Sequence, residues 1–298
     1  MALELKKENI LKILQEGYII ALKWLPDDLY LSLTYRIKMG ERLNLSNPKT
    51  LNEKLQWLKL HDRRKKYIKM VDKYEMKKYV SKRIGKEYVV PTLGVWDHFD
   101  DIDFKELPEK FVLKCTHDSR SIVICTNKDT FDKGKAKEKL EKKLKKNQFW
   151  HSREWPYKGV KPRIIAEPYL IDESGKELKD YKIFCFNGRP DYVEVDFNRF
   201  VEHKLNPYDF DWNPLNFCDT SKNDYEANIP KPMRLNDMKE IAEVLSSDIP
   251  FIRVDFYSIY DKIYVGELTL YPASGFIRYN PEYVDLQMGN KLSLPAKK

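Results

Sequence analysis

The sequence predicts an α+β fold in which a helical region at the N-terminus precedes two mostly antiparallel sheets. The first 84 residues carry helical patterns, whereas strand patterns dominate residues 89–270. Within these, Asn187-Gly188 separates two strand-like segments and is a strong signal for a tight hairpin. Residues 250–270 contain a second pair of strand patterns around a short turn. Strands joined as hairpins, with helices between them, favour antiparallel sheets.

The N-terminal region is predicted to contain three main helices, over residues 5–23, 27–39 and 64–84. Between the second and the third, Thr50 and Glu53 stand at the spacing of a capping box. We therefore expect another helix to begin directly after Thr50.

The strand region includes a predicted hairpin formed by residues 111–117 and 121–126. Lys114 lies inside the first of these strands. A lysine in an otherwise apolar strand needs an anionic partner or an exposed position. The sequence leaves both explanations open.

A Lys-rich helix is predicted over residues 130–147, with a narrow apolar stripe that is typical of a solvated surface helix. Residues 163–170 then form a buried strand pattern that runs into a turn, with Glu167 near its end.

Composition favours an anionic partner. The chain of 298 residues has 54 lysines and arginines against 46 aspartates and glutamates, a net charge of +8. Such a balance suits a nucleotide, a phosphorylated lipid carrier or an acidic glycan. It shows no zinc-finger spacing, RNP motif or basic-aromatic repeat, so no nucleic-acid partner is predicted.

The cysteines and the N-terminus favour a cytoplasmic location. The four cysteines form no C-x-x-C pair and the five histidines are scattered, so neither a disulfide framework nor a zinc site is predicted. Charged residues begin at Glu4, which argues against a secretory signal. The apolar run over residues 17–24 is too short to span a membrane and is broken by Lys23. Peripheral association with the inner face of a membrane stays open.

Chemistry-bearing residues are concentrated in the hairpin of residues 250–270. Because side chains alternate along a strand, Arg253 and Asp255 share one face, and Glu267 and Thr269 share a face of the next strand. Two carboxylates on neighbouring strands beside an arginine suit a divalent cation and a phosphate group. A solvated polar face or an Arg–carboxylate salt bridge would explain the same pattern.

The order of several segments resembles the ATP-grasp superfamily, and more closely its TupA-like branch of bacterial surface-polysaccharide biosynthesis. The resemblance covers about residues 30–285 and is much more specific than any single motif. It is carried by the segments NLSNPKTLNEKLQWLKLHDR, DKYEMKKYV, FVLKCTHDS, KPRIIAEPYL, DYKIFCFNGRP, IRVDFY and GELTLYPASGF. ATP-grasp enzymes hold a nucleotide between two sheets, and with ATP and Mg²⁺ they activate a carboxylate as an acylphosphate, which an amine then attacks.

The resemblance implies a nucleotide site. Lys73 and Lys114 match the lysines that contact phosphates, and Glu167 to Leu170 match the hinge that meets adenine and ribose. The loop that normally covers the phosphates with glycines contains none here. It offers Ser119 and Arg120 instead.

The resemblance also implies a catalytic and metal site. Arg253 matches the arginine that stabilises the transferring phosphoryl group, and Lys182 stands where related ligases place a basic residue. Asp255 and Glu267 match the two metal-binding carboxylates. Thr269 replaces the usual asparagine as the third metal ligand.

The resemblance further implies four regions. They are an N-terminal helical region (1–62), a pre-ATP-grasp segment (63–110), a small ATP-grasp subdomain with the lysine strand and loop (111–170) and a large subdomain with the metal site (171–298).

The function implied is an ADP-forming carboxylate–amine ligase that attaches an amino acid or amine to a uronic acid in capsule, O-antigen or teichuronic-type polysaccharide synthesis. Its partners would be ATP, an acidic sugar or polysaccharide precursor, and an amine; the motifs indicate no oligomeric state. One alternative is a glycosyltransferase, for which Asp209-x-Asp211 is a weak metal motif. Another is a non-catalytic relative that binds a nucleotide or glycan, which the glycine-free loop favours.

Overall fold

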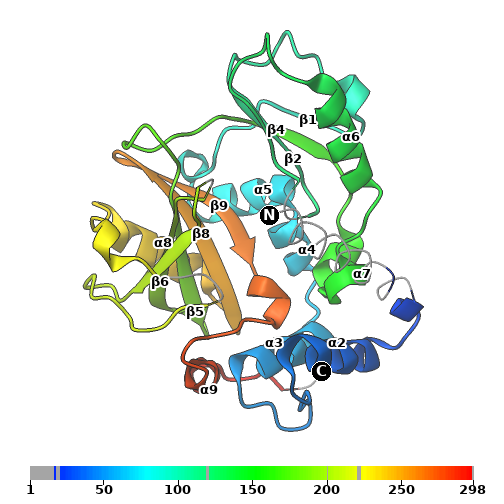
Figure 1. Ribbon diagram of the computed structural model, residues 1–298, viewed down its shortest axis with the longest axis vertical. Coiled ribbons are helices and arrows are strands. Elements are labelled where there is room, and N and C mark those ends of the chain that lie inside the picture. Colours follow the sequence, from blue (N-terminus) through cyan, green and yellow to red (C-terminus); the bar gives the residue numbers. More distant parts are fainter. Residues whose placement is uncertain (1–16, 18–20, 119–120, 200, 220–222, 297–298) are drawn as a thin grey trace, which may run out of the picture.

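The computed structural model describes residues 17, 21–118, 121–199, 201–219 and 223–296. It contains a four-stranded sheet of order β1-β4-β2-β3 and a five-stranded sheet of order β7-β6-β5-β8-β9. Every pair of neighbouring strands within these sheets is antiparallel. Figure 1 shows the two sheets with helices arranged around them. The predicted α+β fold with two antiparallel sheets is confirmed.

The N-terminal helices are α2 (Asp27–Met39), α3 (Leu51–His61), α4 (Lys66–Val71) and α5 (Lys73–Ile84). The predicted capping box is present at the start of α3, where Thr50 and Glu53 accept hydrogen bonds from each other's backbone N–H. The helix predicted over residues 5–23 lies almost wholly outside the described residues. Within the described part of the chain, no helix is long and apolar enough to cross a membrane.

The single helix predicted over residues 64–84 is wrong, because the chain breaks at Asp72. This residue has a ψ of 114°, which ends α4, and its carboxylate accepts hydrogen bonds from the backbone N–H groups of Tyr74 and Glu75 at the start of α5. An aspartate in this position stabilises the first turn of a helix. Arg163 contacts the same carboxylate at 2.9 Å. The break therefore fixes α5 against the small sheet.

The small sheet consists of β1 (Gly94–Trp96), β2 (Phe111–Cys115), β3 (Val123–Cys125) and β4 (Ile164–Pro168). The predicted hairpin is confirmed, since β2 pairs antiparallel with β3. The helix α6 (Lys133–Leu144) covers this sheet with Ala136 and Leu140, and its lysine side chains lie on the surface, as predicted. A core separate from that of the large sheet results.

The large sheet consists of β5 (Asp180–Phe186), β6 (Arg189–Phe197), β7 (Lys204–Tyr208), β8 (Phe251–Ile259) and β9 (Lys262–Thr269). Asn187 and Gly188 both have positive φ angles, 52° and 79°, as the tight hairpin between β5 and β6 requires. The second predicted hairpin is formed by β8 and β9.

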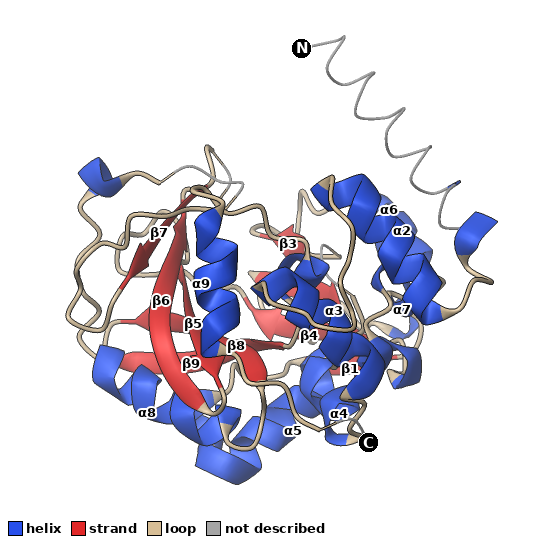
Figure 2. Cartoon of the chain, turned by 90° about the horizontal axis from the view of Figure 1, so that it is seen from below, coloured by secondary structure: helices blue, strands red, loops and turns tan. Residues whose placement is uncertain are grey.

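The two faces of the large sheet differ in chemistry. Its apolar face packs against α8 (Leu235–Ser246), with Ile183, Val193 and Val254 fully buried. Figure 2 shows α8 below this sheet and α9 (Tyr283–Lys291) in front of it, near α3. The charged face meets the small sheet and α5, because Lys73 at the start of α5 lies 4.0 Å from Glu267 of β9. The short helix α7 (Phe149–Ser152) follows α6.

Candidate functional site

A row of four charged residues crosses the large sheet. Lys182 of β5 is the cross-strand partner of Glu194 on one side and of Asp255 on the other, and Asp255 is the partner of Glu267. Direct partners in antiparallel strands have Cβ atoms about 5 Å apart on one face. We call these four residues the carboxylate row. The predicted approach of Asp255 and Glu267 is supported by this pairing.

A β-bulge places the two predicted metal ligands opposite each other. The register of β8 and β9 shifts after Asp255, so that Gly266 has no partner and Glu267 faces Asp255. A Cβ atom on Gly266 would come within 2.8 Å of the ring of Tyr257. Glycine in a bulge allows this close approach. The sequence G-E therefore sets the register of the site.

Arg253 holds Asp255 through two parallel hydrogen bonds, with Nε and Nη2 each 2.6 Å from a carboxylate oxygen. Nη2 also lies 3.4 Å from the Thr269 hydroxyl. Burial raises the pKa of Asp255 and outweighs the opposing effect of Arg253. Burial also acts to raise the pKa of Glu267, but Lys73 and Arg253 lower it overall. The Glu267 side chain is 37% exposed, against 7% for Asp255, so Glu267 is the accessible member of the pair.

The donor set fits a Mg²⁺ ion that a nucleotide helps to bind. Asp255, Glu267 and Thr269 supply hard oxygen atoms, and Mg²⁺ typically takes one or two carboxylates together with phosphate oxygens and water. Among the described residues no group of three or more His, Cys, Asp or Glu side chains could hold a metal ion alone. The geometry therefore suits a metal that arrives with phosphate better than a closed protein cage.

Lys182 lies between two further carboxylates that sequence reasoning missed. Its Nζ contacts Asp196 at 2.5 Å and Glu194 at 3.6 Å. Burial raises the pKa of Glu194 to about 7, although Lys182 acts in the opposite direction. Two carboxylates of β6 thus hold the Lys182 ammonium, and Asp255 of β8 is its cross-strand neighbour on the other side.

A second cluster forms around Glu167 on the small sheet. One carboxylate oxygen lies 2.6 Å from Lys77 of α5, and the other lies 2.6 Å from Lys114 of β2. Burial would raise the pKa of Glu167, but Lys114 and Lys77 lower it to about 2. We call these three residues the lysine cluster. Lys114 has the anionic partner that its apolar strand requires, and Lys77 was missed in the sequence.

The lysine cluster and the carboxylate row face a common space. Tyr257 of β8 is half-buried between them. Burial raises its pKa, and Lys114, Glu167 and Glu267 also act on it. Lys73 bridges the same space, because its Nζ donates to the backbone oxygen of Asp118 and lies 4.0 Å from Glu267. The predicted phosphate ligands Ser119 and Arg120 lie outside the described residues.

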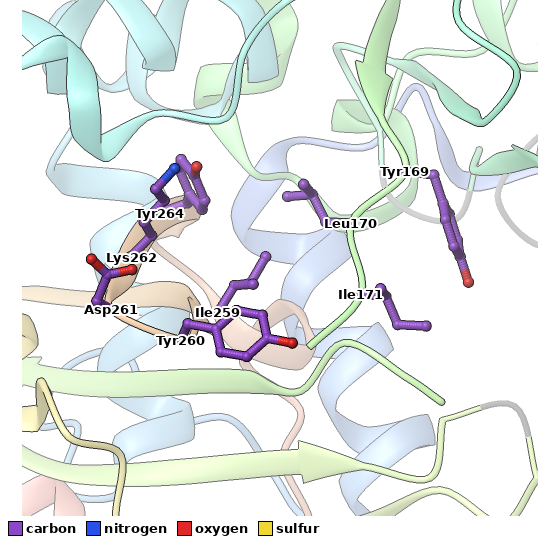
Figure 3. A pocket seen from close by; sticks show the side chains of 8 residues that line it. All are labelled: Tyr169, Leu170, Ile171, Ile259, Tyr260, Asp261, Lys262 and Tyr264. Atoms are coloured by element: carbon purple, nitrogen blue, oxygen red, sulfur yellow. The ribbon is translucent and has the colours of Figure 1, made fainter. Parts of the chain in front are cut away.

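A cavity of about 460 Å³ opens beside Leu170. Figure 3 shows that it is bounded by the chain after β4 and by the turn between β8 and β9. Its walls are formed by Tyr169, Leu170, Ile171, Ile259, Tyr260, Asp261, Lys262 and Tyr264. Its volume lies in the range of small-molecule sites. The structure thus places the predicted hinge residue Leu170 at a cavity.

A family model described as TupA-like ATPgrasp matches residues 53–293. No curated protein gives a significant match. Similar solved structures include D-alanine–D-alanine ligases from Bacillus anthracis (15% identity, 67% of this chain and 57% of that chain, TM-score 0.39) and Helicobacter pylori (13%, 84%, 69% and 0.45). A phosphoribosylamine–glycine ligase from Thermotoga maritima is also similar (13%, 70%, 51% and 0.41).

The chain spans 57% and 63% of the length of the two Bacillus anthracis ligase chains. These likenesses are too distant to give any residue a role.

Proposed function

We infer that this chain, which belongs to the TupA-like ATP-grasp family, is an ATP-dependent ligase. More specifically, we propose that it joins a carboxylate to an amine through an acylphosphate and releases ADP. The observation that carries the proposal is the pairing of two opposite charge clusters across one space. The lysine cluster suits the phosphates of a nucleotide, and the carboxylate row suits the cation that accompanies them.

The nucleotide would lie with its phosphates between Lys114 and Lys73 and its base toward Leu170. Support comes from the cavity beside Leu170 and from the 2.6 Å contact that fixes Lys114 on Glu167. Because Lys77 holds the other oxygen of Glu167, the lysine cluster keeps a net positive charge. In this proposal Glu167 positions Lys114 as well as lying at the hinge.

Asp255, Glu267 and Thr269 would hold Mg²⁺. When bound, this ion would neutralise charge on the β- and γ-phosphate oxygens. Arg253 would stabilise the γ-phosphoryl group as an oxygen of the substrate carboxylate attacks phosphorus and ADP leaves. Its fork is already oriented by Asp255, so little reorganisation is needed. Lys182 would offset the negative charge of the incoming carboxylate.

In the second half-reaction, the amine would attack the acyl carbon and inorganic phosphate would leave. The amine must lose a proton in this step, and the released phosphate can accept it. Both half-reactions then use one arrangement of cations in the space between the two sheets. Such repeated use is expected of a site whose cations are already in position before the reaction starts.

The substrate proposed is a uronic acid of a capsule, O-antigen or teichuronic-type polysaccharide, with an amino acid or amine as the second substrate. The family resemblance and the net charge of +8 support an acidic sugar partner. We further propose that residues 111–170 and 171–298 act as the small and large nucleotide-binding subdomains, after a helical region at 1–62 and a segment at 63–110. The cytoplasm is proposed as the location, because ATP is available there.

In the structure, the Asp209-x-Asp211 motif of the glycosyltransferase alternative forms a local turn. The Asp209 carboxylate accepts hydrogen bonds from the backbone of Asp211 and from Asn213, which is the arrangement of a local turn. The non-catalytic alternative is favoured by one observation, since Arg253 already occupies both oxygens of Asp255.

One experiment separates these functions. Purified protein would be incubated with ATP and Mg²⁺ against a panel of uronic acids crossed with amino acids, and the nucleotide products measured. ADP release that requires both substrates is expected of the ligase. UDP release from a nucleotide sugar would indicate a glycosyltransferase, and nucleotide binding without turnover would indicate the non-catalytic relative.

A further inference from the structure

An exposed apolar stripe runs along the outer side of α2. Leu29, Leu33 and Ile37 recur every four residues, which places them on one helix face. They are 52%, 45% and 66% exposed, and Trp24, just before the helix, is 81% exposed. We call Leu29, Leu33 and Ile37 the α2 stripe. Soluble proteins carry single exposed apolar residues commonly, but aligned sets of this kind mark interaction surfaces.

The opposite side of α2 packs against the rest of the protein. Tyr30, Leu31 and Tyr35 are at most 2% exposed, and Tyr35 packs near the ring of Phe276. Asp27 at the start of the helix is held by Arg63 and Arg153. The helix is therefore apolar on two sides, and packing within the described chain accounts for only one of them. In Figures 1 and 2 this helix lies at the periphery of the molecule, and the exposed fractions of the stripe residues show that they face solvent.

Basic side chains border the C-terminal half of the stripe. Arg36 and Lys38 flank Ile37 on the helix, and Arg42 follows it; all three are exposed. Arg278 joins them, because its guanidinium donates to the backbone oxygen of Lys38. Glu41 is the acidic residue within this stretch. The rim of this half is thus net positive, whereas the exposed Asp28 lies beside Leu29 at the other end of the stripe.

We propose that the α2 stripe docks the protein on an anionic lipid bilayer. Apolar side chains on one helix face, a basic rim and a nearby exposed tryptophan are features of helices that lie in the membrane interface. Charge complementarity selects this occupant, since basic residues next to a membrane are attracted to anionic lipids. From Leu29 to Ile37 the stripe is about 12 Å long, so α2 lies along the surface. The inference does not depend on the ligase proposal.

The test is sedimentation of the full chain with vesicles of phosphatidylcholine, with and without 30% phosphatidylglycerol. We expect binding to the anionic vesicles and little binding to the neutral ones. The double variant Leu33→Glu/Ile37→Glu should bind at least 10-fold more weakly. Leu33→Gln/Ile37→Gln repeats the test without new charge, and Arg36→Gln/Arg42→Gln should reduce binding to the anionic vesicles specifically. Circular dichroism and thermal unfolding check that each variant is folded.

The matched control is Val244→Glu/Leu286→Glu, which changes two similarly exposed apolar residues on α8 and α9. It should bind like the unchanged chain. The proposal is overturned if the full chain binds neither vesicle, or if the control weakens binding as much as the stripe variant does. It is also overturned if light scattering shows a dimer that the stripe variants alone convert to monomer, which would make a second copy the occupant. Vesicle binding that appears only after removal of residues 1–20 would show instead that this segment covers the stripe.

Discussion

The lysine cluster and the carboxylate row face one space, but their positive and negative charges are balanced in opposite ways. Around Glu167, two lysines share one carboxylate, and each makes a 2.6 Å contact. Along the large sheet, Glu194 and Asp255 flank Lys182, Arg253 holds Asp255, and Lys73 lies 4.0 Å from Glu267. The first cluster is complete without a ligand and has positive charge to spare. The second has no positive charge to spare, because Lys182, Arg253 and Lys73 face three carboxylates, and a metal ion would add positive charge there.

The pKa shifts follow the same division. Although Glu167 is buried, two lysines lower its pKa to about 2. Asp255 is also buried, yet its pKa is raised even with Arg253 in contact. Burial raises the pKa of both, and two cations lower each, but Asp255 also faces the carboxylate of Glu267, which raises its pKa further. The comparison supports the proposal that the small sheet binds the anionic phosphates and the large sheet binds the cation that accompanies them.

The strongest test of this division is Glu267→Gln, which removes the accessible charge of the carboxylate row. We expect ADP formation to fall about 1,000-fold or more, because an ion that neutralises transferring phosphate contributes several kcal/mol to the transition state. The free energy of unfolding should change little, since the side chain is 37% exposed. ADP release and thermal unfolding would be measured together.

Glu243→Gln is the matched control for this change, because Glu243 is an exposed residue of α8 on the far face of the sheet. It should retain full turnover. Full turnover by Glu267→Gln at saturating ATP would remove the metal role from the carboxylate row and favour the non-catalytic alternative.

The next effect is on the pH dependence of stability. Glu167 has a pKa of about 2 in the folded chain, below the usual 4.5, so its stabilising contribution is present above about pH 4.5 and is lost as pH falls toward 2. The difference in free energy of unfolding between the unchanged chain and Glu167→Gln should therefore shrink by about 3 kcal/mol over that range. Denaturant titrations at pH 2 to 6 would measure it.

Asp255 should show the opposite trend. Because its pKa is raised on folding, its contribution to stability falls as pH rises above about 4. The difference between the unchanged chain and Asp255→Asn should move in the reverse direction to that for Glu167→Gln. If both differences in the free energy of unfolding change in the same direction with pH, the charges of the two clusters are not balanced as described.

The sequence predicted the hairpins and the shared faces, but it could not predict the register. A regular hairpin continued from Asn187-Gly188 would pair Lys182 with Val193. The bulge after Phe184 pairs Lys182 with Glu194 instead, close to Pro190, which lacks the N–H needed for a regular ladder. One residue of slip exchanges the faces of a strand. Glu194 and Asp196 were missed for this reason.

Lys77 was missed for a different reason. It stands four residues after Lys73 on α5, so a helical reading puts both lysines near one face. Its partner Glu167 lies 90 positions later in another element, and pairing between distant elements is set by packing. The break at Asp72, which orients α5, also contradicts the one long helix that local pattern favoured.

A smaller effect is expected on nucleotide affinity. Lys114→Ala removes one of the two cations from the lysine cluster and leaves Lys77 to neutralise Glu167. ATP should bind about 10- to 100-fold more weakly, the value of one hydrogen bond to a charged group. Calorimetry without Mg²⁺ would measure this, so that the carboxylate row does not contribute.

Lys142→Ala, on the exposed side of α6, is the matched control and should bind ATP normally. Equal loss in both variants would mean that overall charge, and not the lysine cluster, attracts the nucleotide.

The smallest expected effect is that of Thr269→Asn. The Thr269 hydroxyl is 3.4 Å from Arg253, a weak contact, and it stands beside the two carboxylates as the third oxygen donor. An asparagine carbonyl is a stronger acceptor and a more frequent Mg²⁺ ligand, and it could still receive a hydrogen bond from Arg253. Turnover should stay equal or rise a few-fold, with half-maximal activity at lower Mg²⁺. Thr269→Val, which keeps the shape and removes the oxygen, should shift the Mg²⁺ dependence the other way. ATP affinity without Mg²⁺ should be unchanged in both variants, because the lysine cluster is untouched. If Thr269→Asn instead lowers turnover more than 10-fold at saturating Mg²⁺, the hydroxyl acts through Arg253 and not through the metal. The carboxylate row would then bind its cation with two protein ligands alone.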